Sequence, residues 1–124
     1  MATMLNPYLT VEEYFALERR LGVKYEYYLG EMYPMSRASG AHVFLRANLM
    51  LPVVKRLQGT LWRALGSDLR VHIQATGLYT YPEVSIYRGP LAADNHQTAT
   101  NPRVIIEILS PSTRRNDRTH QVVT

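Results

Sequence analysis

The stretch Arg103–Asp117, RVIIEILSPSTRRND, decides how the chain should fold. Its β-branched run Val104–Ile106 predicts a buried strand, and the cap-like letters SPST then predict a helix from about Ser112 or Thr113. The strand also carries Glu107, where another aliphatic residue would pack. A carboxylate in that position needs a partner, because buried charges are stable only when they are paired or bind a cation.

A second predicted strand, Glu83–Tyr87, also carries one carboxylate among aliphatic residues. If it lies beside the strand predicted at 103–109, Glu83 and Glu107 face each other and must share a proton or bind a cation. Oxygen ligands in a chain without cysteine or an HxxH-type pair favour Mg²⁺ or Mn²⁺ over Zn²⁺. The alternative is structural: each glutamate lies in solvent at a strand end or pairs with an arginine such as Arg103.

Before these strands, the sequence predicts a helix and a β-hairpin. Thr10 and Glu13 form a capping-box pattern, and the amphipathic helix that follows should stop at Gly22. The tyrosine-rich segment after it alternates around Leu29–Gly30, which predicts two short strands joined by a tight turn.

A second helix is expected from Ser39 to about Gly59, with a kink or a restart at the interior Pro52. Its predicted apolar stripe consists of Val43, Leu45, Leu49 and Val53 or Val54. The segment that follows should form strands interrupted at Gly66–Ser67 and Ala75–Gly77, then a polar loop at Pro90–Asn101. This order of elements indicates an α/β (α+β) domain with a mixed sheet.

Composition is that of one ordinary globular domain, residues 1–124, with 46% hydrophobic and 19% charged residues. No basic stretch leads into an apolar one near the start and no run of eighteen apolar residues occurs, so we expect a cytoplasmic protein without a membrane partner. The net charge of +4 weakly favours polyanions, and among the cations only Lys24 and Lys55 are lysine. The arginine forks suit phosphate oxygens.

Several short blocks in a fixed order carry a family resemblance that spans almost the whole chain. The blocks YEYYLGEMYPMS, SDLRV, TGLYTYPEVSI, NPRVIIEILSPST and ND, with His42, resemble the Uma-two family of restriction-endonuclease-like proteins of bacteria. That family is placed in the PD-(D/E)XK nuclease superfamily. The resemblance implies a restriction-endonuclease-like mixed sheet flanked by helices, Mg²⁺- or Mn²⁺-dependent hydrolysis of DNA phosphodiester bonds, and a homodimer. It also implies that the C-terminal strands of the family are missing from residues 1–124.

The resemblance assigns roles to residues one at a time. Glu83 stands at the family's aspartate position and Glu107 at its glutamate position, and both would hold the metal. Leu109 stands two residues after Glu107, so the catalytic lysine position falls on the third helix, where this chain has Gln121. Glutamine cannot carry the positive charge expected there, and Arg118, one turn earlier, is the best local substitute.

Further residues are assigned around this pair. Glu26, in the family's YE block, would be a third carboxylate of the catalytic site. His42 either approaches a phosphate or bonds the backbone at the helix start, and Asp68 either belongs to the site or bonds its own backbone in a turn. The side chains expected to grip the DNA backbone are Arg114, Arg115 and Arg118, with His42.

Three functions therefore compete. The first is a metal-dependent endonuclease. The second is a catalytically inactive relic of the same fold that still binds nucleic acid or a metal, which Gln121 and the short C-terminal segment favour. The third is a small dimeric interaction module whose tyrosine-rich strands form a protein interface, since tyrosine is enriched in such interfaces.

Overall fold

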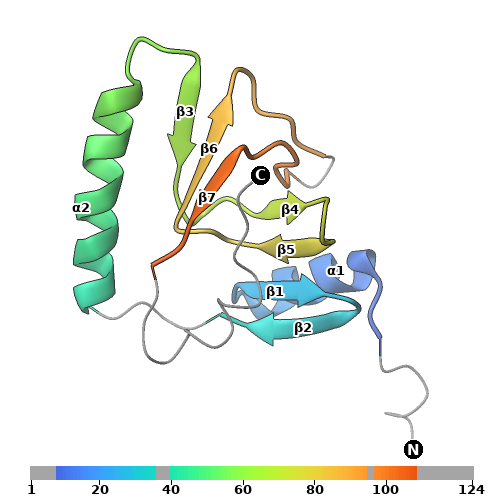
Figure 1. Ribbon diagram of the computed structural model, residues 1–124. Helices are drawn as coiled ribbons and strands as arrows, with labels where there is room; N and C mark the ends of the chain where they lie inside the picture. The colour runs from blue at the N-terminus through green and yellow to red at the C-terminus, as the bar shows by residue number, and fades with distance from the viewer. Residues whose placement is uncertain (1–7, 36–39, 95–96, 109–124) are drawn as a thin grey trace, which may run out of the picture.

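The computed structural model describes residues 8–35, 40–94 and 97–108. Over these residues the chain forms an α+β domain with two helices and two antiparallel sheets, so the predicted fold class is confirmed (Figure 1). The elements are α1 (Val11–Leu21), β1 (Tyr25–Tyr28), β2 (Glu31–Pro34), α2 (Gly40–Leu57), β3 (Trp62–Leu65), β4 (Val71–Ile73), β5 (Leu78–Thr80), β6 (Val84–Arg88) and β7 (Val104–Ile106).

The strands divide into a four-stranded sheet and a three-stranded sheet. The first sheet has the order β2-β1-β5-β4 and the second has the order β3-β6-β7. A parallel bridge between Val71 of β4 and Ala99 adds the chain before β7 to the first sheet. One core cluster takes side chains from β4, β5 and β6 together with Ala99, so it lies between the two sheets and joins them.

The predicted first helix and hairpin are confirmed. Thr10 caps α1, because its hydroxyl accepts a hydrogen bond from the Glu13 amide at 3.1 Å, and the Thr10 amide donates one to the Glu13 carboxylate at 2.7 Å. Gly22 ends the helix in the left-handed region, with φ of 68°. Leu29 and Gly30 make the turn between β1 and β2 with φ of 50° and 85°, a conformation that glycine adopts readily.

Aromatic side chains attach α1 to the first sheet. Tyr14 of the helix stacks on Tyr27 of β1, with ring centroids 4.9 Å apart, and Phe15 meets Tyr79 of β5 edge to face. All four rings are buried. The tyrosines of the central strands therefore build this core, which removes Tyr27 and Tyr79 from the protein interface that the interaction-module hypothesis requires.

The second helix differs from its prediction in two ways. It runs without interruption through Pro52, so the expected restart is wrong, and none of its residues is buried. Val43 and Leu45, two members of the predicted apolar stripe, are 49% and 55% exposed. The half-buried face follows the helical period through His42, Arg46, Leu49, Val53 and Leu57, so the prediction is confirmed for Leu49 and Val53 and wrong for Val43 and Leu45. Two polar side chains, His42 and Arg46, thus begin the half-buried stripe, which an apolar pattern cannot reveal.

The remaining segments agree in outline with the sequence. The strands predicted after α2 form β3 to β6, interrupted by turns at the expected glycines, and the chain between β6 and β7 is mostly loop. β7 is shorter than the strand predicted at 103–109, and the predicted third helix lies outside the described residues. Among the helices of the described residues, none is long and apolar enough to cross a membrane.

The buried carboxylate of Glu18 holds Tyr81, which lies two residues before Glu83. Glu18 of α1 accepts hydrogen bonds from Arg70 Nη1 and from the Tyr81 hydroxyl, each at 2.7 Å, and from the Tyr25 amide at 2.9 Å. The Arg70 guanidinium also lies 4.0 Å from the centroid of the Phe15 ring. Burial, followed by the nearby Glu18 carboxylate, raises the pKa of Tyr81, so its hydroxyl stays protonated and donates.

We predict that Tyr81→Phe lowers the free energy of unfolding by about 1.5–3 kcal/mol, because Glu18 loses one of its donors in a site with little access to water. Tyr33→Phe is the matched control, since it removes a hydroxyl that bonds the exposed Glu31. The control should change stability by less than about 0.5 kcal/mol. Urea unfolding followed by circular dichroism measures both values. Equal effects from the two variants would contradict a stabilising role for the Glu18 cluster.

Candidate active site

Antiparallel pairing of β6 with β7 brings the two predicted metal ligands together. Val84 is the partner of Ile106, and one further step along the same register sets Glu83 opposite Glu107. The Glu83 amide donates a hydrogen bond to Glu107 Oε1 at 3.2 Å. The two strands therefore lie side by side, which was the condition on which the sequence argument depended.

The carboxylate of Glu83 is held by two side chains of α2. Arg46 Nε donates to Glu83 Oε1 at 2.6 Å, and His42 Nε2 contacts Glu83 Oε2. The Glu83 side chain is 13% exposed and that of Arg46 is 30% exposed, so solvent screens this ion pair only in part. The structural alternative is thus partly realised: Glu83 does pair with an arginine. Its partner is Arg46, whereas Arg103 lies over the Trp62 ring.

Sequence reasoning missed Arg46 and did not include the contact of His42 with Glu83. The expected contact of His42 with a phosphate stays a prediction, and in the structure its ring contacts the Glu83 carboxylate. The signal that points to Arg46 is its position four residues after His42, which places both on one face of a helix. Nothing in the sequence of α2 alone says that this face meets the strand that begins after Glu83.

Two other carboxylates have partners of their own. Glu26 of β1 accepts a hydrogen bond from the Thr80 hydroxyl at 2.5 Å, at the end of β5 and three residues before Glu83. Asp68 is fully exposed and pairs with Lys24 at 2.9 Å. That hydrogen bond, reinforced by the Lys24 charge, lowers the pKa of Asp68. The alternative of a turn aspartate bonded to its own backbone is therefore corrected: a lysine is the partner.

The other predicted site residues, Gln121, Arg114, Arg115 and Arg118, lie outside the described residues. Within residues 8–35, 40–94 and 97–108, no group of three or more histidine, aspartate or glutamate side chains is arranged to hold a metal ion. What the described residues do bring together is a pair of carboxylates, Glu83 and Glu107, with His42 and Arg46 against one of them.

This arrangement has a definite chemical capacity. Two carboxylates at opposed backbone positions concentrate negative charge where a hard cation is favoured. At present Arg46 supplies positive charge to the same carboxylate, so a divalent ion and the guanidinium compete for Glu83. The histidine beside them can donate to or accept from an oxygen of a bound group.

Comparisons with known proteins agree with this reading of the fold. A family model named Uma2 and described as "Putative restriction endonuclease" matches residues 11–122. Two uncharacterised Synechocystis proteins, slr1290 and sll1609, are 36% and 32% identical to the chain over 112 and 120 residues. The matches cover 90% and 95% of this chain, and 59% and 68% of the respective relatives.

A solved structure shares the architecture. The crystal structure of a putative nuclease belonging to DUF820 from Anabaena variabilis superposes with a TM-score of 0.68 at 19% sequence identity. It covers 90% of this chain, which in turn spans 64% of that protein. At this identity the similarity shows a shared fold. The chain spans about three fifths of the length of the first of these relatives.

We predict that Arg46→Met lowers the free energy of unfolding by about 1–3 kcal/mol, because it leaves the little-exposed Glu83 carboxylate without its cationic partner. Arg56→Met on the same helix is the control, since Arg56 is exposed in the last turn of α2. We expect the control to stay within about 0.5 kcal/mol of the unsubstituted protein. Chemical denaturation without divalent metal tests this pair, and a neutral Arg46→Met would refute the stabilising role of the contact.

Proposed function

The chain belongs to the Uma2 family, and from this premise we propose that it is a metal-dependent nuclease that hydrolyses phosphodiester bonds in DNA. The observation that carries the proposal is the opposition of Glu83 and Glu107 at the ends of paired strands. Their oxygens are ligands that suit Mg²⁺ or Mn²⁺, and the chain offers no cysteine to favour a softer metal.

The residues present fit a divalent ion on one condition. Glu83 and Glu107 would hold it, and for this Arg46 must release Glu83 Oε1. The release is feasible because Arg46 is partly exposed and its long side chain can turn toward solvent or toward a bound phosphate. When bound, the metal would polarise the phosphate and lower the pKa of a coordinated water.

The other side chains of the site would act on the substrate. His42 lies against Glu83 and can hydrogen-bond a phosphate oxygen, while a released Arg46 guanidinium can balance charge on the phosphate. Glu26 would assist at the edge of the site through its bond to Thr80. Gln121 would hold a water or a phosphate oxygen without charge, and Arg118, Arg114 and Arg115 would contact the DNA backbone.

The ion pair of Glu83 also favours a second function, that of a relic which does not cut DNA. The Arg46–Glu83 ion pair satisfies the carboxylate without any metal, and the family's lysine position holds Gln121. A relic of the nuclease fold that binds DNA without cutting it would show these two features. Formation of a homodimer stays a prediction for either function.

Cleavage of supercoiled plasmid separates the two functions. We expect Gln121→Lys to cut with Mg²⁺ or Mn²⁺ at least about a hundredfold faster than the unsubstituted chain, because a lysine restores positive charge for the transition state. Gln121→Met is the matched control of similar length without charge and should not accelerate cutting. Adding Glu107→Gln to the lysine variant should abolish the reaction. If none of these proteins cuts plasmid, the nuclease proposal fails and the relic replaces it.

Measurements of metal binding test whether Arg46 must release Glu83 before a metal can bind. Because the guanidinium competes for Glu83, we predict that Arg46→Met tightens Mn²⁺ binding by about tenfold in calorimetric titrations, whereas Arg56→Met leaves it unchanged. Glu83→Gln should weaken the binding. Affinity that is unchanged or reduced in Arg46→Met would show that the arginine does not occupy the place of the metal.

A further inference from the structure

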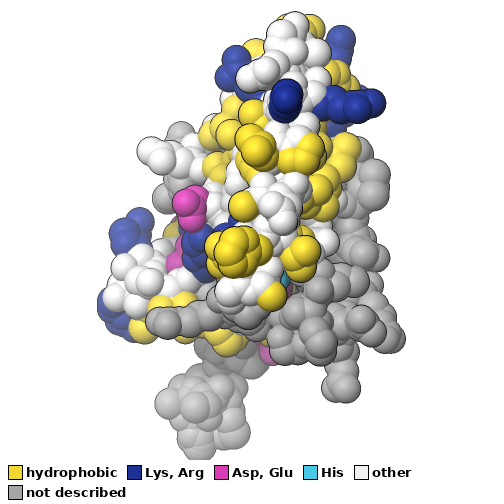
Figure 2. Space-filling view, turned by 90° about the vertical axis from the view of Figure 1, so that its left-hand side faces the viewer, with side chains coloured by type: hydrophobic (Ala, Val, Ile, Leu, Met, Phe, Trp, Pro, Cys, Tyr) yellow, Lys and Arg dark blue, Asp and Glu magenta, His cyan; other side chains and the backbone are white. Residues whose placement is uncertain are grey.

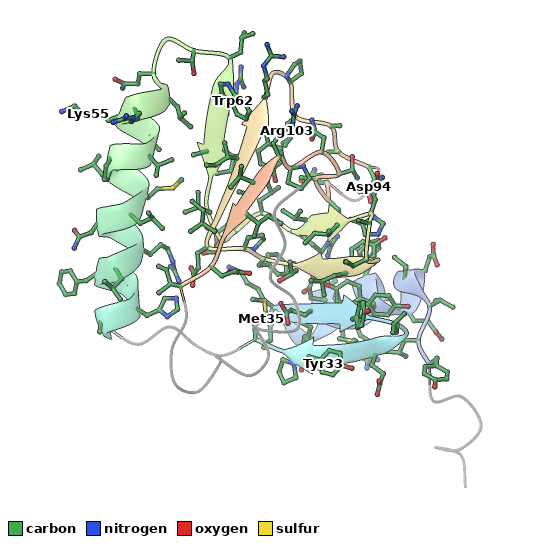
Figure 3. All side chains as sticks on the ribbon, viewed as in Figure 1. Tyr33, Met35, Lys55, Trp62, Asp94 and Arg103 are labelled. Atoms are coloured by element: carbon green, nitrogen blue, oxygen red, sulfur yellow. The ribbon has the colours of Figure 1, made fainter. Side chains whose placement is uncertain are left out.

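The end of the second sheet that lies away from Glu83 carries exposed cations around one tryptophan. Arg88 is the strand partner of Trp62 and projects from the same face of the sheet, whereas Arg63 projects from the opposite face at the same end. The Arg103 guanidinium lies 5.8 Å from the Trp62 ring centroid. Lys55 is exposed in the last turn of α2, which leads to the same end (Figure 3). We name the following five residues the basic surface: Lys55, Arg56, Arg63, Arg88 and Arg103.

Acidic residues are nearly absent from the segments that form this end. The ranges 52–65, 84–93 and 97–106 contain no aspartate or glutamate, although Glu83, Asp94 and Glu107 directly adjoin them. Figure 2 shows lysine and arginine side chains gathered at the end of the molecule where α2 passes into β3. Most described acids lie instead on α1 and the β1–β2 hairpin: Glu12, Glu13, Glu18, Glu26 and Glu31. The charge is therefore divided between two ends of the molecule.

We infer that the basic surface binds the phosphate backbone of duplex DNA beside the bond that is cut. The inference rests on DNA being the substrate, as proposed above. Glu83 and Arg88 are five residues apart along one extended segment, which corresponds to roughly 17 Å, or on the order of five base pairs of DNA. One duplex can thus reach both the acid pair and the basic surface.

The chemistry of the surface favours a phosphate backbone over an acidic protein. Its cations are mainly arginines, whose planar forks match phosphate oxygens, and the Trp62 ring holds the Arg103 guanidinium by a cation–π contact. Apolar side chains such as Leu61 are exposed at the same end, but five exposed cations match a polyanion better than the apolar centre of a protein interface. The contacts would be independent of base sequence, because phosphates carry no sequence information directly.

Binding of a fluorescein-labelled duplex, measured by anisotropy in EDTA so that no cutting occurs, tests this inference. We compare Arg63→Gln/Arg88→Gln with the control Arg19→Gln/Arg20→Gln, which removes the same charge from exposed positions at the end of α1. The first double variant should bind about tenfold more weakly near physiological salt. Its slope of log affinity against log salt should be shallower by about two. The control should keep the affinity of the unsubstituted protein.

The other outcomes overturn the inference. They are an equal loss in both variants, unchanged affinity in Arg63→Gln/Arg88→Gln, or no binding of the duplex by the unsubstituted protein. Circular dichroism of both variants establishes that each is folded. Failure here is distinguishable from failure of the nuclease proposal, because plasmid cleavage that persists in Arg63→Gln/Arg88→Gln would retain the nuclease and remove only this surface.

Discussion

The contact of Arg46 with Glu83 is the interaction that ties the site to the fold. No residue of α2 is fully buried, so the half-buried side chains of Leu49, Val53 and Leu57 hold the helix against the second sheet only in part. A charge-assisted hydrogen bond at 2.6 Å, together with the His42 contact, fixes the start of the helix against the entry to β6. The same carboxylate that anchors α2 is therefore the one that the proposed metal site would use.

Much of the fold was predictable because local sequence decides it. The capping box at Thr10, the stop at Gly22 and the turn at Leu29–Gly30 each follow from a few adjacent residues. The placement of one acid on each of two strands was also visible, and antiparallel register then sets Glu83 opposite Glu107. Patterns of this kind need no knowledge of distant contacts.

The partner of Glu83 was not predictable, because it depends on contacts between segments that are far apart in the sequence. Arg46 lies 37 residues before Glu83, and their meeting depends on how α2 packs against the sheet. Apolar periodicity correctly predicts Leu49 and Val53 on the inner face but also predicts Val43 and Leu45, which are exposed, because the half-buried stripe of α2 begins with polar His42 and Arg46. Hydrophobic patterning finds a helix but assigns its inner face only in part when charged residues share in the packing.

The strength of the Arg46–Glu83 ion pair determines how tightly a metal must bind for the proposed nuclease to work. A partly buried pair worth about 1–3 kcal/mol would weaken the apparent metal affinity by roughly 5- to 140-fold, since each 1.4 kcal/mol is a factor of ten. An ion that binds two carboxylates strongly can overcome this competition, whereas weak binding leaves the arginine in place. In the proposed nuclease, the uncharged Gln121 would separately leave the transition state without a positive charge. Replacing that glutamine by lysine acts on catalysis and replacing Arg46 acts on metal binding, so the two defects can be separated.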